Sequence, residues 1–154
     1  MKLLALDIDG VLNSYEDHMQ LSHAVTNGLP MPPNIMYYDR GNWVDAVKLN
    51  KLKAIITPEI TVIGISSWFS NVRMNRDKIS KFLGINISAV TRNTGGGQGR
   101  VDTFEELVKT IRPTHIAVLD DQSDWGIFSY CHVQPLREGL TDLNIEELEF
   151  LLEL

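Results

Sequence analysis

The sequence has little cysteine and little positive charge, and both shortages limit what the protein can be. Cys131 is the only cysteine among 154 residues, so no disulfide can form within the chain, which suits a reducing cytoplasm. The formal net charge of −6 disfavours binding to long duplex nucleic acid, which needs many cationic contacts to phosphate. No apolar run is long enough to span a bilayer, and the first residues lack the pattern of a signal peptide. We therefore expect a globular cytoplasmic protein that makes no membrane contact.

Short apolar runs alternate with segments of helical spacing along most of the chain. We expect strands over 2–8, 61–65, 85–91, 115–119 and 131–136, and helices over 43–56, 72–83, 103–111 and 144–152. Gly84 is expected to end the second helix, while Asp102 and Asn144 are expected to cap the starts of the last two. Strands that alternate with helices predict an α/β fold with a parallel sheet and right-handed crossovers. A chain of this length suits one domain, residues 1–154.

Residues 13–42 do not follow this alternation. They show no clear periodicity and contain Pro30, Pro32 and Pro33, so we expect a long loop or a small excursion. His18 and His23 lie in this segment, but no third side chain has the spacing of a metal site. The two histidines are therefore expected to be solvated or to face a substrate.

Polar residues follow three of the expected strands, at the end where parallel α/β sheets bind ligands. They are Asp7, Asp9 and Gly10 after the first strand, Ser66 and Ser67 after the second, and Asp120 and Asp121 after the fourth. Carboxylates that meet at one edge repel each other, and a hard cation such as Mg²⁺ compensates that repulsion. An aspartate held in this way can attack phosphorus. The alternative is that these acids belong to solvated turns.

Four short motifs together resemble the haloacid-dehalogenase-like (HAD) superfamily. LDIDGVLN resembles the first motif, DxDG[TV]L, and IGIS, which ends at Ser66, resembles the second. Arg100 stands where the third motif places Lys or Arg, and VLDDQSD resembles the fourth. TVIGISSWFSN and PLREGLTDLNIEEL are similar to a branch that includes HAD domains of multi-enzyme RNA-repair proteins. The resemblance implies a three-layer, parallel-sheet, Rossmann-like HAD fold with a short or absent cap, in which 13–42 forms a flap.

The resemblance also implies catalytic roles. Asp7 is expected to be the nucleophile and a Mg²⁺ ligand. Asp9 is expected to act as general acid and then as general base, with its main-chain carbonyl on the metal. Ser66, or Ser67 as the alternative, is expected to bind the phosphoryl oxygens, and Arg100 to neutralise phosphate and the nucleophile. Phosphoryl transfer depends mainly on such positioning and charge neutralisation.

Further residues are expected to hold the metal and the substrate. Asp121 is the expected direct metal ligand of the acidic pair, and Asp120 is expected to support it directly or through water. Gly10 is expected to allow a tight turn beside the substrate, and Asn71 to line the site. The implied cofactor is Mg²⁺.

The sequence departs from the family pattern at two places. The third motif more often has Lys, and the forked guanidinium of Arg100 binds phosphate differently from an ammonium group. In some relatives an Arg follows the tryptophan, whereas Phe69 follows Trp68 here. This difference weakens the inference that the protein shares the substrate of the RNA-repair branch. Trp68 and Phe69 themselves can be core residues, a wall of the cleft, or a platform that stacks on a base.

The leading hypothesis is a Mg²⁺-dependent phosphatase that hydrolyses a phosphomonoester through an aspartyl-phosphate. Its expected partner is a phosphorylated small molecule or a nucleic-acid end, with a nucleotide or a nucleic-acid 3′-phosphate preferred. One alternative is a non-enzymatic phosphate- or partner-binding domain with the same fold. A phospho-acceptor signalling domain is disfavoured, because such domains place the acidic pair before the phosphorylated Asp.

Overall fold

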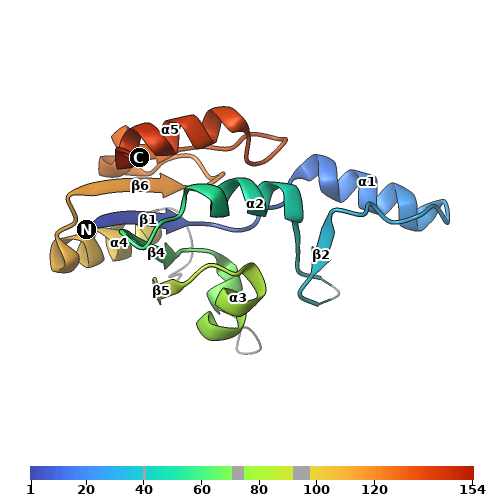
Figure 1. Cartoon of the computed structure of the whole chain (residues 1–154), viewed down its shortest axis with the longest axis horizontal. Coiled ribbons are helices and arrows are strands. Elements are labelled where there is room, and N and C mark those ends of the chain that lie inside the picture. Colours follow the sequence, from blue (N-terminus) through green and yellow to red (C-terminus); the bar gives the residue numbers. More distant parts are fainter. Residues whose placement is uncertain (40, 71–74, 92–97) are drawn as a thin grey trace.

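The protein is built on a five-stranded parallel sheet with the strand order β5-β4-β1-β6-β7. The computed structural model describes residues 1–39, 41–70, 75–91 and 98–154. The sheet strands are β1 (Lys2–Leu6), β4 (Ile60–Gly64), β5 (Ile87–Val90), β6 (His115–Leu119) and β7 (His132–Val133). The predicted parallel α/β sheet is therefore confirmed, although β7 is shorter than the expected strand over 131–136 (Figure 1).

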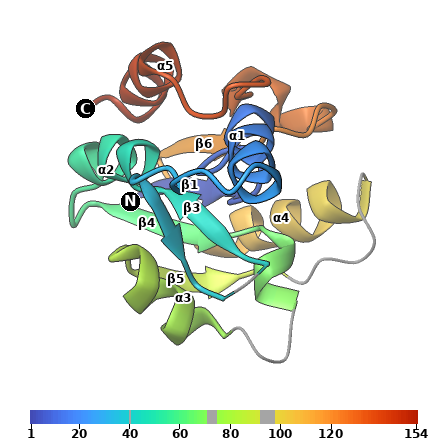
Figure 2. The same cartoon turned by 90° about the vertical axis from the view of Figure 1, so that its right-hand side faces the viewer.

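Helices cover both faces of the sheet and give the three layers of a Rossmann-like fold. One face carries α2 (Ala46–Ile55), α3 (Arg76–Leu83) and α5 (Asp142–Leu152), and the other carries α4 (Gln98–Ile111) and the short 3₁₀ helix η2 (Gly126–Cys131). In Figure 2, α2 and α4 lie on opposite sides of the strands. No helix in the described part of the chain has the length and apolar character needed to cross a membrane.

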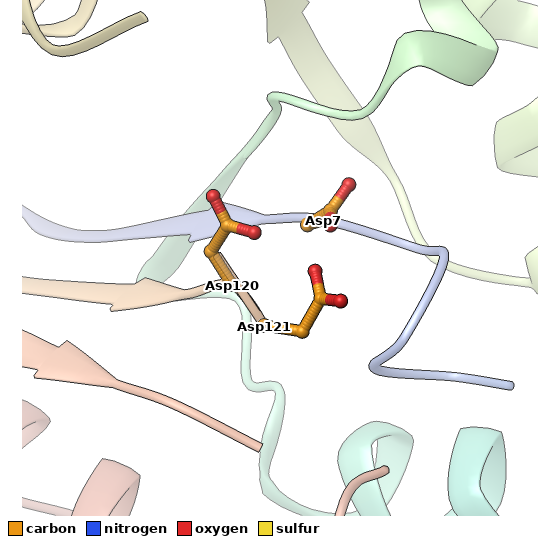
Figure 3. A group of neighbouring side chains, drawn as sticks. All are labelled: Asp7, Asp120 and Asp121. Atoms are coloured by element: carbon orange, nitrogen blue, oxygen red, sulfur yellow. The ribbon is translucent and has the colours of Figure 1, made fainter. Parts of the chain in front are cut away.

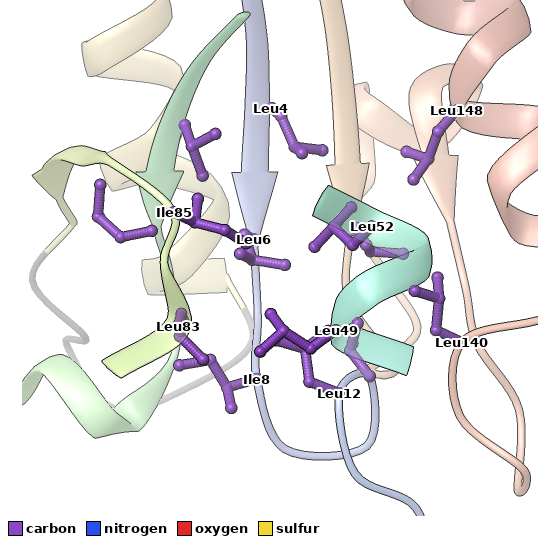
Figure 4. Close-up of a cluster of buried hydrophobic side chains, with 14 of the residues drawn as sticks. Leu4, Leu6, Ile8, Leu12, Leu49, Leu52, Leu83, Ile85, Leu140 and Leu148 are labelled. Carbon is purple, nitrogen blue, oxygen red and sulfur yellow. The ribbon is translucent and has the colours of Figure 1, made fainter. Parts of the chain in front are cut away.

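The alternation of β1 side chains produces two hydrophobic cores. Leu4 and Leu6 point to one face, where they pack with α2, α3 and α5 (Figure 4). Leu3 and Ala5 point to the other face, toward Phe104 of α4 and its neighbours. Because β1 is buried on both faces and paired on both edges, it holds the residue that follows it in a fixed place.

The end of α3 agrees with the sequence-based expectation, whereas the starts of α4 and α5 differ from it. Gly84 ends α3 in the left-handed conformation, with φ of 67°, as expected. Helix α4 already includes Gln98, so Asp102 lies inside the helix, where its carboxylate accepts a hydrogen bond from Gln98 Nε2. Thr141, not Asn144, caps α5, and Asn144 completes a capping box three residues later. The expected caps at Asp102 and Asn144 were therefore wrong.

The segment 13–42 contains a helix that the sequence analysis missed. Helix α1 (Tyr15–Thr26) begins after Ser14, whose hydroxyl accepts from the Asp17 backbone N–H. It buries only Asp17 and Ala24, so it has no apolar stripe that would reveal a helical period. A two-stranded antiparallel ribbon follows, formed by β2 (Ile35–Tyr37) and β3 (Trp43–Asp45). In Figure 1, α1 and β2 lie beyond the carboxyl ends of the central strands.

A charged triad attaches α1 to the body of the protein. Lys48 Nζ lies 3.0 Å from Asp17 of α1 and 3.0 Å from Asp45, which also caps α2. All three side chains are largely withdrawn from solvent, so these charge-assisted hydrogen bonds are less screened than a surface pair. The helix expected over 43–56 was placed too early, because 43–45 is a strand and the helix begins at Ala46, directly after its cap Asp45.

Candidate active site

The ends of β1 and β6 bring three carboxylates together. Leu6 and Leu119 pair across the sheet, and the Asp7 backbone N–H donates to the Leu119 carbonyl at 2.9 Å. Asp7 and Asp120 are the next residues on these two strands, and Asp121 follows. One carboxylate oxygen of Asp7, Asp120 and Asp121 lies within 4.8 Å of the other two (Figure 3). The sequence analysis predicted this convergence from the parallel arrangement of the strands.

Mutual repulsion makes this cluster costly to keep ionised. Burial raises the pKa of Asp7 well above its usual range, and the nearby Asp120 carboxylate raises it further. Burial also raises the pKa of Asp121, again with a contribution from the charge of Asp120. A set of carboxylate oxygens with excess negative charge is the donor set that a hard divalent cation prefers. The three acids therefore fit a metal ion such as Mg²⁺.

Asp120 is the most fully enclosed of the three acids. Its Oδ2 accepts from Arg100 Nη1 at 2.6 Å and from Trp125 Nε1 at 3.0 Å, and its Oδ1 accepts from the Gln122 backbone N–H. The side chain has no exposed surface. These contacts fix its orientation, and Trp125 is a site residue that sequence reasoning missed.

Arg100 points its positive charge at the acidic pair. Its Nη1 contacts Asp120, while its Nε is buried and has no hydrogen-bond partner among the described residues. Its charge also acts on Asp7, where it opposes the rise in pKa that burial and Asp120 cause. The sequence analysis expected Arg100 to neutralise the nucleophile and phosphate. The structure adds a direct ion pair with Asp120.

Asp9 lies past the strand, in the turn, and is held by two side chains. Its Oδ1 accepts from Trp68 Nε1 at 3.0 Å and from Asn13 Nδ2 at 3.0 Å. Asn13 also accepts from the Gly10 backbone N–H and donates to the Trp43 carbonyl. Both donors use Oδ1, and no donor among the described residues contacts Oδ2. Asn13 was missed as a site residue, although it stands in the first motif. Trp68 was considered as a core residue, a cleft wall or a stacking platform, but not as a donor to Asp9.

Gly10 is required by the approach of Asp121. It has φ of 80°, and a Cβ added there would collide with the Asp121 carboxylate. The expected tight turn is thus present, and its function is to make room for a candidate metal ligand.

The end of β4 carries Ser66 and Ser67. The Ile65 backbone N–H donates to the Leu6 carbonyl, which keeps this end beside the end of β1. Ser66 is buried, and its hydroxyl accepts from the Trp68 backbone N–H at 3.2 Å. Ser67 is exposed and begins the 3₁₀ helix η1 (Ser67–Ser70). Asn71, the remaining predicted site residue, lies outside the described residues.

A comparison with known protein families agrees with this arrangement. Residues 3–144 match the family described as the HAD domain in Swiss Army Knife RNA repair proteins. The chain belongs to this family of HAD domains. The resemblance predicted from the four motifs is therefore confirmed, and membership indicates a HAD-type hydrolase in general. No curated protein and no solved structure matches the chain at a significant level.

Two further side chains of this HAD domain hold the backbone of the acidic pair. His132 Nε2 lies 2.8 Å from the Asp120 carbonyl, and because a carbonyl only accepts, this nitrogen carries the proton. Gln134 Nε2 donates to the Asp121 carbonyl at 3.0 Å. His132 lies in the strand expected over 131–136, and the sequence analysis assigned it no role in the site. No sequence signal links these two side chains to the site, because the contacts depend on how β7 lies beside β6.

Proposed function

We propose that this HAD domain is a Mg²⁺-dependent phosphatase that hydrolyses a phosphomonoester through an aspartyl-phosphate on Asp7. The observation that carries the proposal is the group of three carboxylates at the ends of β1 and β6, with Asp9 two residues beyond Asp7. Asp7, Asp121 and Asp120 would hold the ion, together with the main-chain carbonyl of Asp9. Bound Mg²⁺ would supply the positive charge that lets an anionic phosphate approach an anionic nucleophile.

The first half of the reaction uses Asp7 and Asp9. A carboxylate oxygen of Asp7 attacks phosphorus, and the bond between phosphorus and the leaving oxygen breaks. Asp9 Oδ2 gives its proton to that leaving oxygen, which departs as an alcohol. Arg100 neutralises the charge of the phosphoryl oxygens, and the Ser66 hydroxyl donates a hydrogen bond to them.

The second half reverses the role of Asp9. Its carboxylate takes a proton from water, and the resulting hydroxide oxygen attacks phosphorus. The bond between phosphorus and the Asp7 oxygen breaks, which returns Asp7 and releases inorganic phosphate. The buried position of Asp7 limits the water that reaches the intermediate before Asp9 directs it.

The preferred substrate class is a nucleotide or a nucleic-acid end with a 3′-phosphate. The family description supports this choice, since it names RNA repair proteins. The structure of the flap also supports it, because α1 and the ribbon of β2 and β3 together are smaller than an ordinary domain. A bulky phosphate ester can enter beside such a flap.

The proposal is tested with p-nitrophenyl phosphate and a panel of nucleotides, with and without Mg²⁺. We expect turnover that chelation abolishes and added Mg²⁺ restores, and that Asp7→Asn removes. Asp77→Asn is a matched control, because this aspartate is exposed on α3. If Asp7→Asn retained Mg²⁺-dependent turnover, or if no ester were hydrolysed, a non-enzymatic phosphate-binding domain would become the better interpretation.

A further inference from the structure

A cavity of about 280 Å³ opens on the side of the site where Asp9 lies. Asp9, Gly10 and Asn13 form its inner end, next to the proposed chemistry. Tyr15 and His18 of α1 form its outer walls together with Trp43 of β3. The proposed mechanism does not use these aromatic residues, and they therefore need another explanation.

The outer walls present aromatic rings. Tyr15 and His18 are three residues apart on α1, so they lie on the same side of the helix. The rings of His18 and Trp43 are nearly parallel, with an angle of 6° and centroids 6.4 Å apart. Tyr15 is 53% exposed, and the Arg137 guanidinium carbon lies 4.7 Å from its ring centroid. Ring faces of this kind stack on planar heteroaromatic groups.

A second cavity, of about 260 Å³, lies across Gly10 and Tyr15 from the first. It is lined by Asp121 and Arg137, and it thus borders the proposed metal ligand rather than the general acid. The group that leaves phosphorus must be next to Asp9, which protonates it. The first cavity is therefore the one that the leaving group would enter.

The charge of the first cavity restricts its occupant. Among the described residues that line it there is one carboxylate, Asp9, and no lysine or arginine. A second phosphate or a carboxylate placed inside this cavity would be repelled by Asp9. The volume is close to the lower limit of ordinary ligand pockets, roughly 300 Å³, which suits a single ring system with its sugar.

We propose that this cavity is the leaving-group subsite and that Tyr15 and His18 select a leaving group whose part inside the cavity is an uncharged unit with a planar aromatic ring, such as a nucleoside. This inference rests on the proposed phosphatase function, because Asp9 defines which cavity receives the leaving group. The ion pairs of Lys48 with Asp17 and Asp45 fix α1 against the body, so the rings form a preorganised platform.

The test compares adenosine 3′-monophosphate with glycerol 2-phosphate as substrates. Wild-type protein should favour the nucleotide in kcat/KM, and Tyr15→Ala and His18→Ala should each reduce that preference by roughly 5- to 100-fold, as expected for losing one stacking contact. His18→Phe should restore the preference, because it restores an aromatic face. Met19→Ala is the matched control, since Met19 is 51% exposed on the same helix and does not line the cavity.

A binding measurement distinguishes a failure of this inference from a failure of the proposed function. The affinity of Asp7→Asn protein for the same two esters is measured by calorimetry with Mg²⁺. Tighter binding of the nucleotide that depends on Tyr15 and His18 would support the subsite even if no turnover were found. Equal affinity for both esters, or a preference that the Tyr15 and His18 variants keep, would overturn it even if the phosphatase were active.

Discussion

The hydrogen bond from Trp68 to Asp9 leads to a selective kinetic prediction. Trp68 is almost fully buried, and its ring packs near Phe82 and Tyr38, at centroid distances of 6.4 and 6.1 Å. Trp68→Phe keeps an aromatic ring there but removes the Nε1–H that donates to Asp9. The variant should therefore fold while its general acid loses one of two positioning contacts.

The size of the effect follows from the bond that is lost. A hydrogen bond to a charged group contributes about 1.5–3 kcal/mol. Asn13 still holds the same oxygen, and Asp9 is exposed, so the lower value applies. We expect kcat/KM for an alkyl phosphate, which reports the steps through formation of the aspartyl-phosphate, to fall by roughly 10-fold, because each 1.4 kcal/mol corresponds to a factor of ten.

The assay compares glycerol 2-phosphate with p-nitrophenyl phosphate. An alkoxide needs a proton to leave, whereas p-nitrophenolate leaves readily without one, so Trp68→Phe should affect the aryl ester far less. Trp125→Phe is a matched control, because Trp125 donates to Asp120 instead. Trp125→Phe should change kcat/KM for both esters by the same factor. An equal loss of kcat/KM on the two esters in Trp68→Phe would refute the assignment of Asp9 as the acid that Trp68 positions, because kcat/KM excludes the later hydrolysis of the aspartyl-phosphate.

Three further predictions concern stability and reactivity. Lys48→Met should lower the free energy of unfolding by about 2 kcal/mol, measured with urea, because Asp17 and Asp45 lose their shared cation. Burial raises the pKa of Asp45, but hydrogen bonds from Asn34, Lys48 and the Val47 N–H outweigh that effect and lower the pKa below 3.8. The stability that the Asp45 carboxylate contributes is therefore complete above pH 3.8 and is lost as the pH falls through the lowered pKa. The stability advantage of wild type over Asp45→Asn should shrink accordingly in acid; an advantage independent of pH would contradict this. Burial raises the pKa of the Cys131 thiol to about 11, so Ellman's reagent at pH 8 should label it only after unfolding, and rapid labelling of folded protein would contradict its burial.

The sheet and its acidic edge could be predicted from the sequence because they follow from local patterns. The apolar runs before Asp7 and Asp120 are short, buried on both faces and separated by helices, which is typical of parallel strands. Once the strands are parallel, the residues that follow them must share an edge. The chemistry of the cluster could therefore be inferred without coordinates.

The helix within the flap and the contacts that support the acids could not be predicted in the same way. Helix α1 exposes most of its surface, so its sequence has no apolar period to detect. The contacts of Trp68 with Asp9 and of Trp125 with Asp120 join residues whose relation depends on tertiary packing. Likewise, motif order placed Arg100 near the site, but only its position on α4 shows that it pairs with Asp120.

The amide of Asn13 has a consequence for how such a domain can change. This single side chain connects Asp9, the Gly10 backbone and the Trp43 carbonyl, where the chain returns from the flap to the body. The flap thus helps to position the proposed general acid, in addition to forming a wall of the cavity beside it. A relative with a shorter or longer excursion at this point must hold its second aspartate by another route, and grafting a foreign flap here would alter proton transfer together with substrate choice.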